Sequence, residues 1–262
     1  MKEEKIIDHI TNWLKSYAEK AGMKGFVIGV SGGIDSALAS TLCARTGLEV
    51  LCLEMPIHQA ENQVNRALRH IDWLQEKHQN VRMETVNLTP VFDSLVAEFP
   101  KVENEVDRFM ALANTRARLR MTSLYYFAAY HKLLVAGTGN KVEDFGVGFF
   151  TKYGDGGVDL SPIADLMKTE VYALASYLGI NHEILDAPPT DGLWGDDRTD
   201  EDQIGASYPE LEWAMRQDAL GKQLDDFNGR EKEVYDIYKR LNRANQHKMN
   251  PIPVCEIPEK WK

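Results

Sequence analysis

The stretch Phe26-Val27-Ile28-Gly29-Val30, followed by Ser31-Gly32-Gly33 and by Ala37 through Leu42, decides the fold. The first five residues are predicted to form a short buried strand, the glycines end it, and the last six begin a helix. A turn between a strand and a helix directs its backbone N–H groups toward one point, where an anion is stabilised. The sequence therefore predicts an anion-binding loop at the end of a strand.

The same alternation of strand and helix repeats along the chain. Val50 to Leu53 and Val81 to Leu88 are predicted strands, and Asn62 to Lys77 between them has helical periodicity. A long helical pattern runs from Glu103 to about Tyr130 and leads into the strand Leu133 to Ala136. Its predicted apolar stripe consists of Val106, Met110, Ala113, Ala117, Met121 and Leu124. Strands separated by helices imply right-handed crossovers and a parallel sheet. We expect an α/β fold with a doubly wound open parallel sheet and helices on both faces.

Size and composition are those of a globular protein. The chain has 262 residues, 44% hydrophobic and 27% charged, which excludes disordered and collagen-like classes. We expect residues 1–262 to form a single domain with C-terminal helices near Tyr208 to Arg216 and Glu231 to Asn245, followed by a proline-containing tail. The net charge of -10 has the wrong sign for a nucleic-acid surface, so an anionic ligand must meet a local cluster of basic groups.

The cysteines and the N-terminal segment indicate the cellular compartment. Cys43, Cys52 and Cys255 contain no CxxC pair, so they indicate neither a disulfide framework nor a zinc ribbon. The first 20 residues interleave charges with apolar residues and lack the pattern of a signal peptide or membrane anchor. We therefore expect a cytoplasmic protein. The apolar stripe of this first helix consists of Ile6, Ile7, Ile10, Trp13, Leu14 and Tyr17.

The glycine loop differs from two common phosphate-binding loops. It has neither the Gly-Lys-Ser/Thr ending of a Walker A loop nor GxGxxG spacing. Without that lysine, phosphate charge must meet a metal ion or basic groups from elsewhere, and Asp35 is placed to hold Mg²⁺. Ser31-Gly32-Gly33-Ile34-Asp35-Ser36 resembles the SGGxDS loop of the N-type ATP pyrophosphatases. The resemblance implies ATP binding by Gly29, Val30, Ser31, Gly32, Gly33, Ile34, Asp35 and Ser36.

Two further segments resemble the NAD synthetase family. Gly137 to Glu143 and Phe150 to Asp159, with its Phe-Thr-Lys-Tyr-Gly-Asp-Gly-Gly-Val-Asp sequence, match stretches that line the ATP and deamido-NAD sites of that family. The resemblance implies an adenine nucleotide alpha hydrolase-like fold, a homodimer, Mg²⁺ as cofactor, and ATP, deamido-NAD and ammonia as small-molecule substrates. It continues through Pro162, Lys168, Ala187 to Thr190, Thr199 to Asp202 and Gln246 to Lys248.

The resemblance also implies roles for individual residues. Thr138, Lys168 and Thr190 match groups on ATP, and Asp35 and Glu143 match a pair of Mg²⁺ ligands. Contacts with deamido-NAD are implied for Arg118, Lys152, Asp159, His247 and Lys248.

Some of these roles have independent physical support. Thr138 follows a predicted strand, at the edge where open α/β sheets bind ligands. Asp35 and Glu143 offer hard oxygen ligands from two crossover loops. Lys168 is a cation in the first turn of a helix, where the helix dipole disfavours it unless a phosphate is near. Each role also has an alternative. Thr138 could be a hydroxyl that closes a turn, Glu143 a solvated loop carboxylate, and Lys168 an ordinary charge in the first turn of a helix.

Other positions leave alternatives open. On a helix, Arg116 and Arg120 share a face and Arg118 points away from it. Either the two faces have different environments, or the arginines form a basic face in contact with solvent. Glu54 stands where many family members carry a basic residue near the ATP ribose, and Met249 stands where another basic residue is common.

Two long segments are predicted as loops. Gly139 to Pro162 holds six glycines, which at this length favours a functional loop, and Ala187 to Asp202 is polar and expected to be mobile. Within the first loop, Asp155 is a candidate for holding ammonium and removing its proton, or it is only a turn residue.

The implied reaction is the ATP-dependent amidation of deamido-NAD by ammonia. The nicotinate carboxylate attacks the α-phosphorus, and ammonia then displaces AMP from the acyl-adenylate. This chemistry needs positioning and electrostatic stabilisation rather than a side-chain nucleophile. No glutaminase-like pattern precedes the loop, so we expect free ammonia or a separate supplier. The alternatives are another adenylating ligase of the superfamily, or a nucleotide-binding module without turnover.

Overall fold

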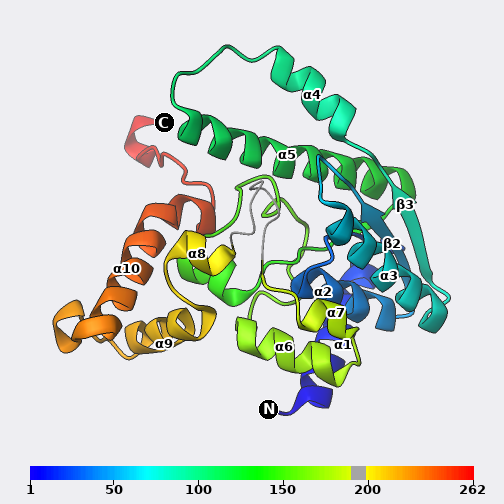
Figure 1. The fold of residues 1–262 in the computed structure, drawn as a ribbon, viewed down its shortest axis with the longest axis horizontal. Helices are drawn as coiled ribbons and strands as arrows, with labels where there is room; N and C mark the ends of the chain where they lie inside the picture. Colours follow the sequence, from blue (N-terminus) through cyan, green and yellow to red (C-terminus); the bar gives the residue numbers. More distant parts are fainter. Residues whose placement is uncertain (190–198) are drawn as a thin grey trace.

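The computed structural model describes residues 1–189 and 199–262. Its centre is a sheet with the order β3-β2-β1-β4, in which every pairing is parallel (Figure 1). The strands are β1 (Gly25–Gly29), β2 (Glu49–Glu54), β3 (Val81–Thr85) and β4 (Leu134–Val135). The predicted fold class, an open parallel sheet with helices on both faces, is confirmed.

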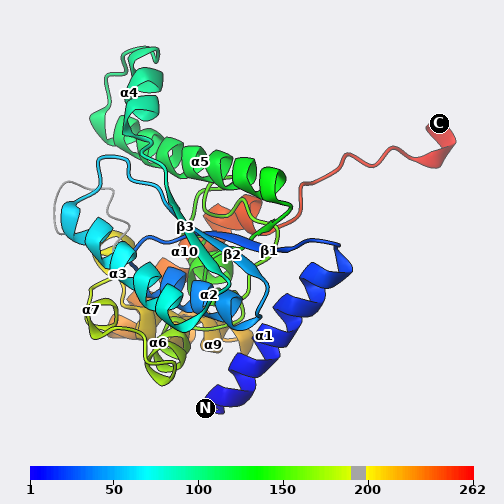
Figure 2. The same ribbon diagram turned by 90° about the vertical axis from the view of Figure 1, so that its right-hand side faces the viewer.

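Helices cover the sheet because alternate strand residues point to opposite faces. On one face, Phe26 and Ile28 join a core with α1 (Glu3–Lys20), α2 (Ile34–Arg45), α3 (Glu61–Lys77) and α6 (Lys168–Tyr177). On the other, Val27 and Leu51 pack with α4 (Thr89–Ala97) and α5 (Glu105–His131). Figure 2 shows α5 and α2 on opposite sides of the strands.

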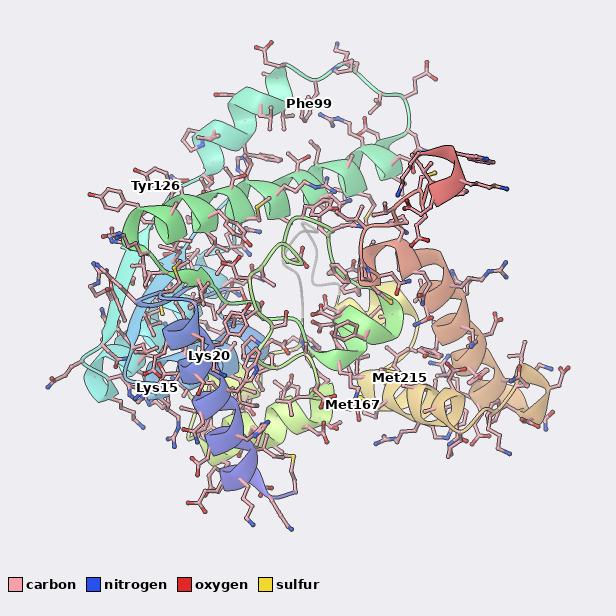
Figure 3. All side chains as sticks on the ribbon, turned by 180° about the vertical axis from the view of Figure 1, so that it is seen from behind. Lys15, Lys20, Phe99, Tyr126, Met167 and Met215 are labelled. Atoms are coloured by element: carbon pink, nitrogen blue, oxygen red, sulfur yellow. The ribbon has the colours of Figure 1, made fainter. Side chains whose placement is uncertain are left out.

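A separate cluster lies beside the sheet. It combines the π-helix η1 (Val142–Val147) with α8 (Asp200–Ile204), α9 (Tyr208–Ala219) and α10 (Gly229–Met249). Figure 3 labels Met167 and Met215, which pack against this cluster between α6 and α9. The remaining short elements are α7 (His182–Leu185), η2 (Leu224–Asp226) and η3 (Glu259–Trp261).

Several predicted boundaries were wrong. β3 ends at Thr85 rather than Leu88, because β2 offers no paired residue beyond Glu54 and a helix begins at Thr89. β4 contains only two residues, and Ala136 instead forms a parallel bridge with Leu160. The predicted loop Gly139 to Pro162 contains the π-helix.

Two apolar stripes are narrower than predicted. In α1, Trp13 and Tyr17 are exposed and pack on each other, with ring centroids 5.8 Å apart. In α5, Val106 and Met110 are exposed, whereas Ala113 is buried. Further exposed apolar groups lie on α5, where Tyr126 points outward (Figure 3), and on the tail that extends beyond α10 (Figure 2). Among the described helices, none is long and apolar enough to span a membrane.

Candidate active site

A cavity of about 620 Å³ lies at the carboxyl ends of β1, β2 and β4. This is the edge at which open α/β sheets bind ligands. Its lining includes Gly29 to Ser36, Thr138, Lys168, Glu143 and Asp155, so these predicted residues lie around one space. Thr190 lies outside the described residues.

The loop between β1 and α2 is held by its own serines. Ser36 Oγ accepts from the Ser31 backbone N–H at 3.2 Å and donates to the Gly33 carbonyl at 2.9 Å. Ser31 Oγ accepts from the Gly33 N–H at 3.2 Å. Gly32 has a φ of +80°, and a Cβ there would lie 2.9 Å from the Gln63 carbonyl oxygen of α3. The loop needs glycine for both its conformation and its contact with α3.

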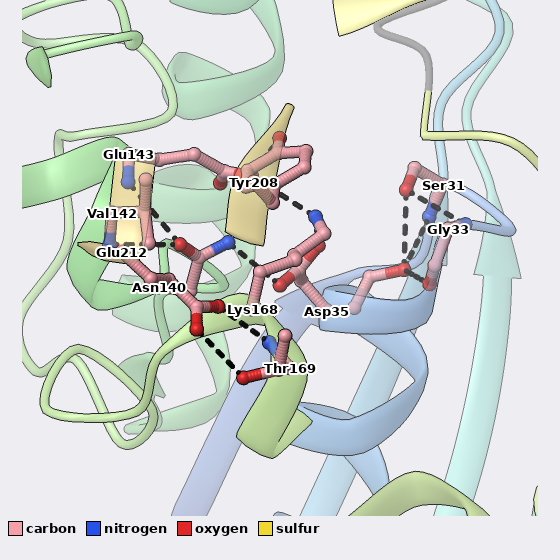
Figure 4. Close-up of polar contacts among 11 residues, drawn as sticks. Ser31, Gly33, Asp35, Asn140, Val142, Glu143, Lys168, Thr169, Tyr208 and Glu212 are labelled. Carbon is pink, nitrogen blue, oxygen red and sulfur yellow. Dashed lines mark hydrogen bonds and ion pairs between the residues drawn. The ribbon is translucent and has the colours of Figure 1, made fainter. Parts of the chain in front are cut away.

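A buried lysine joins the three elements around this loop (Figure 4). Lys168 begins α6 and is 3% exposed. Its Nζ donates to Asp35 Oδ2 at 2.5 Å and to Glu143 Oε1 at 3.0 Å. Residues separated by more than 100 positions in the sequence therefore form one charged cluster.

Two other residues orient this cluster. Asn140 is fully buried, donates to Asp35 Oδ1 at 3.0 Å, and accepts from the backbone N–H groups of Val142 and Glu143. Tyr208 donates its hydroxyl to Glu143 Oε1 at 2.7 Å. Asn140 thus links the start of η1 to the carboxylate on α2.

The cluster fixes protonation states. Burial lowers the pKa of Lys168, but the charges of Asp35 and Glu143 outweigh it and raise the pKa, so the ammonium remains charged. Burial, followed by the charges of Glu143, Asp155 and Asp35, raises the pKa of the neighbouring Asp144 carboxyl to about 8. The Asp144 carboxyl is therefore largely protonated at neutral pH.

The carboxylates of Asp35 and Glu143 fit a magnesium ion bound together with a nucleotide. Both reach the same ammonium, so they lie close to each other. Mg²⁺ is commonly held by one or two carboxylates, substrate phosphates and water. Within residues 1–189 and 199–262, no group of three or more His, Cys, Asp and Glu side chains forms a metal site. A complete coordination shell would thus need ligands from the nucleotide or water.

A turn at Thr151 to Asp155 forms another wall. Asp155 Oδ1 accepts from the Thr151 backbone N–H at 3.0 Å, and Thr151 Oγ1 donates to Asn114 Oδ1 at 2.6 Å. Lys248, from the end of α10, also lines the cavity and donates to the carbonyls of Gly148 and Phe150. The turn is tied to both α5 and α10.

Four residues implied for deamido-NAD lie outside the described cavity lining. Arg118 donates to the Lys152 carbonyl at 3.3 Å, and Lys152 Nζ donates to the His247 carbonyl. These three lie together on the surface. Asp159 accepts from the Val135 N–H at 2.8 Å and from the Tyr125 hydroxyl at 3.0 Å, so it supports β4. Their roles toward a dinucleotide stay predictions.

Sequence reasoning missed several cavity residues. Arg120, not Arg118, lines the cavity, and it donates to the Met55 carbonyl at 3.0 Å. The helical spacing had separated the two arginines without deciding which one faced the site. Tyr208 belonged to no motif, because its contact with Glu143 spans 65 positions. Asn140 lay inside the Gly137 to Glu143 motif, which was a signal for it.

Fold and site together define the class. A phosphate-type loop at the carboxyl edge of a parallel sheet, beside a buried Asp–Lys–Glu cluster, belongs to an α/β nucleotide-binding protein of the adenine nucleotide alpha hydrolase-like type. The sequence profile of the family described as NAD synthase matches residues 6–252. The chain belongs to the NAD synthase family.

Individual relatives agree with this assignment. NH(3)-dependent NAD(+) synthetases of Carboxydothermus hydrogenoformans and Archaeoglobus fulgidus are 36% and 37% identical, with 98% of this chain and 97% and 98% of those proteins aligned. A structure of NMN synthetase from Francisella tularensis is 31% identical, with a TM-score of 0.82 and 99% of each chain covered. The NH3-dependent NAD synthetase of Campylobacter jejuni is 26% identical, with a TM-score of 0.78, covering 98% of this chain and all of that one.

Proposed function

We propose that the protein is a C–N bond-forming ligase that amidates deamido-NAD with ammonia, using ATP and producing NAD⁺, AMP and pyrophosphate. The observation that carries this proposal is the meeting of the β1–α2 loop with Asp35, Glu143 and Lys168 in one cavity. The family and its ammonia-dependent relatives support the reaction.

The reaction has two steps. A carboxylate oxygen of the nicotinate group attacks the α-phosphorus of ATP, and the bond between the α-phosphorus and the α,β-bridging oxygen breaks to release pyrophosphate. Ammonia then attacks the acyl carbon, loses a proton, and expels AMP, which keeps the carboxylate oxygen. The loop N–H groups and Lys168 stabilise the negative charge on the departing pyrophosphate. Positioning the two substrates in one cavity supplies the rest of the rate enhancement.

A magnesium ion is part of the proposal. Asp35 and Glu143 would hold it, and the ion would offset charge on the phosphates. Lys168 then provides the charge balance between the two carboxylates when the nucleotide is absent.

Asp155 is proposed to receive ammonia. Its carboxylate faces the cavity and belongs to the turn tied to Asn114 through Thr151. A carboxylate attracts ammonium and accepts its proton, which leaves the nucleophilic free amine.

The second substrate is proposed to extend from the cavity across the surface that carries Arg118, Lys152 and His247. Lys248 lines the cavity and follows His247 in the chain, and Asp159, which accepts from Val135 at β4, is proposed to take part as well. Thr190 completes the proposed ATP contacts. We also propose a homodimer, for which the exposed aromatic face of α5 is a suitable surface.

Residues 1–262 are proposed to act as one synthetase domain supplied with free ammonia or by a separate glutaminase. A cytoplasmic location agrees with cysteines that are all unpaired.

Likeness to the Francisella tularensis NMN synthetase favours a second candidate, amidation of the corresponding mononucleotide. Both candidates are tested by supplying ATP, Mg²⁺ and ammonium with either acid and separating the products. We expect NAD⁺, AMP and pyrophosphate in equal amounts from deamido-NAD. A higher kcat/KM for the mononucleotide would select the second candidate. Release of ADP would contradict adenylation, and nucleotide binding without product would favour a non-catalytic module.

A further inference from the structure

Most cations around the cavity are already neutralised or hydrogen-bonded. The described lining contains four basic side chains, Arg66, Arg120, Lys168 and Lys248. Lys168 faces two carboxylates, Lys248 donates to two carbonyls, and Arg120 donates to the Met55 carbonyl and to Gln59 Oε1. Among these four, only Arg66 forms neither an ion pair nor a hydrogen bond within the described residues.

Arg66 is partly buried, yet its Nε is buried without a hydrogen-bond partner. Leaving a charged donor unpaired in this way is costly. Such a group is explained when a ligand supplies the missing acceptor.

The position of Arg66 points to the acceptor. It lies on α3, and a Cβ on Gly32 would lie 3.2 Å from the Arg66 Cβ. α3 connects β2 to β3, whereas Lys168 follows the segment that pairs with β4. Arg66 and Lys168 therefore approach the loop from the directions of opposite edges of the sheet. The loop N–H groups that favour an anion lie between them.

We propose that Arg66 binds the polyphosphate of ATP and is the cation that supplies uncompensated positive charge to the β1–α2 loop. This inference rests on the proposed function, since it needs a nucleotide in the cavity. A guanidinium gives two parallel N–H donors that match phosphate oxygens, and it stays charged. Arg66 thereby does what the lysine of a Walker A loop does, but from α3, the second helix after the loop.

The test uses the full-length protein and two probes, ATP with Mg²⁺ and inorganic pyrophosphate, each titrated by calorimetry. Arg66→Met keeps a long side chain without its charge. Arg66→Lys keeps the charge without the two parallel N–H donors of the guanidinium. Arg69→Gln is the matched control, because Arg69 lies on the same helix but is exposed and pairs with Glu183. Thermal unfolding checks that each variant folds.

We expect Arg66→Met to weaken the binding of both probes about 10- to 100-fold. Arg66→Lys should bind them with intermediate affinity, and Arg69→Gln should bind them like the wild type. In turnover assays the KM for ATP should rise while the KM for the dinucleotide changes little. If folded Arg66→Met binds both probes as tightly as the wild type, the inference is overturned while the proposed function stands. If the wild type binds neither probe, both are overturned.

Discussion

Lys168 remains charged inside the protein because two carboxylates face it. Its side chain is 4% exposed, and those of Asp35 and Glu143 are 17% and 15% exposed. Removing one member of a buried charged group leaves the others uncompensated, which destabilises more than the intact group stabilises. The cluster is therefore a structural element of the fold as well as the proposed support of catalysis.

Lys168→Gln should lower the free energy of unfolding by about 3 kcal/mol, measured by urea denaturation without divalent ions. Mg²⁺ should restore part of that loss if Asp35 and Glu143 bind it. Adenylation should fall by at least about 100-fold, since phosphate charge is no longer offset.

Lys141→Gln is the matched control. Lys141 also pairs with a carboxylate, that of Asp165 at 2.8 Å, but both side chains are exposed. Exposed pairs contribute about 0 to 1 kcal/mol. Equal unfolding free energies for the two variants would show that the Lys168 cluster carries no special structural role.

Among the elements, the β1–α2 loop is held by the approach of α3. Gly32 combines a φ of +80° with a Cβ position 2.9 Å from the Gln63 carbonyl oxygen. A side chain at this position would be strained in its backbone and would push the loop away from α3. That displacement would also move the loop N–H groups out of line with the proposed phosphates.

Gly32→Ala should therefore cost about 1 to 3 kcal/mol of stability and reduce kcat/KM for ATP by about 100-fold or more. Gly22→Ala provides the control, because its φ is +66° but nothing lies within 4 Å of its Cβ position. Denaturation curves and steady-state kinetics measure both effects. A Gly32→Ala protein as active as Gly22→Ala would contradict the packing argument.

Local elements were predictable where the pattern was local. The first strand, its glycine turn and the helix after it lie in consecutive sequence, and all three were predicted. The strand is shifted by one residue, from Phe26–Val30 to Gly25–Gly29, and the helix begins at Ile34 rather than Ala37. The π-helix at Val142 to Val147 was not predictable, because it depends on two backbone N–H groups that donate to Asn140 Oδ1 and on packing against α10. Trp13 and Tyr17 had apolar spacing, but they are exposed, whereas Ile7, Ile10 and Leu14 of the same stripe are buried in the core.

At the scale of the whole molecule, the site is assembled from distant segments. Asp35, Glu143 and Lys168 were predicted by resemblance, and the fold brings them into contact. Tyr208 and Arg66 could not be predicted, because only the tertiary packing of α9 and α3 gives them their neighbours. The net charge of -10 therefore says little about the cavity, where a few cations meet the proposed polyanions.

The central claim is that the cavity activates a carboxylate by adenylation. The most direct measurement uses deamido-NAD labelled with ¹⁸O in its nicotinate carboxylate, together with ATP, Mg²⁺ and ammonium, and determines the label in the products by mass spectrometry. An acyl-adenylate predicts that each AMP formed carries one carboxylate oxygen and that pyrophosphate carries none. Label in inorganic phosphate with release of ADP, or AMP without label, would contradict the account.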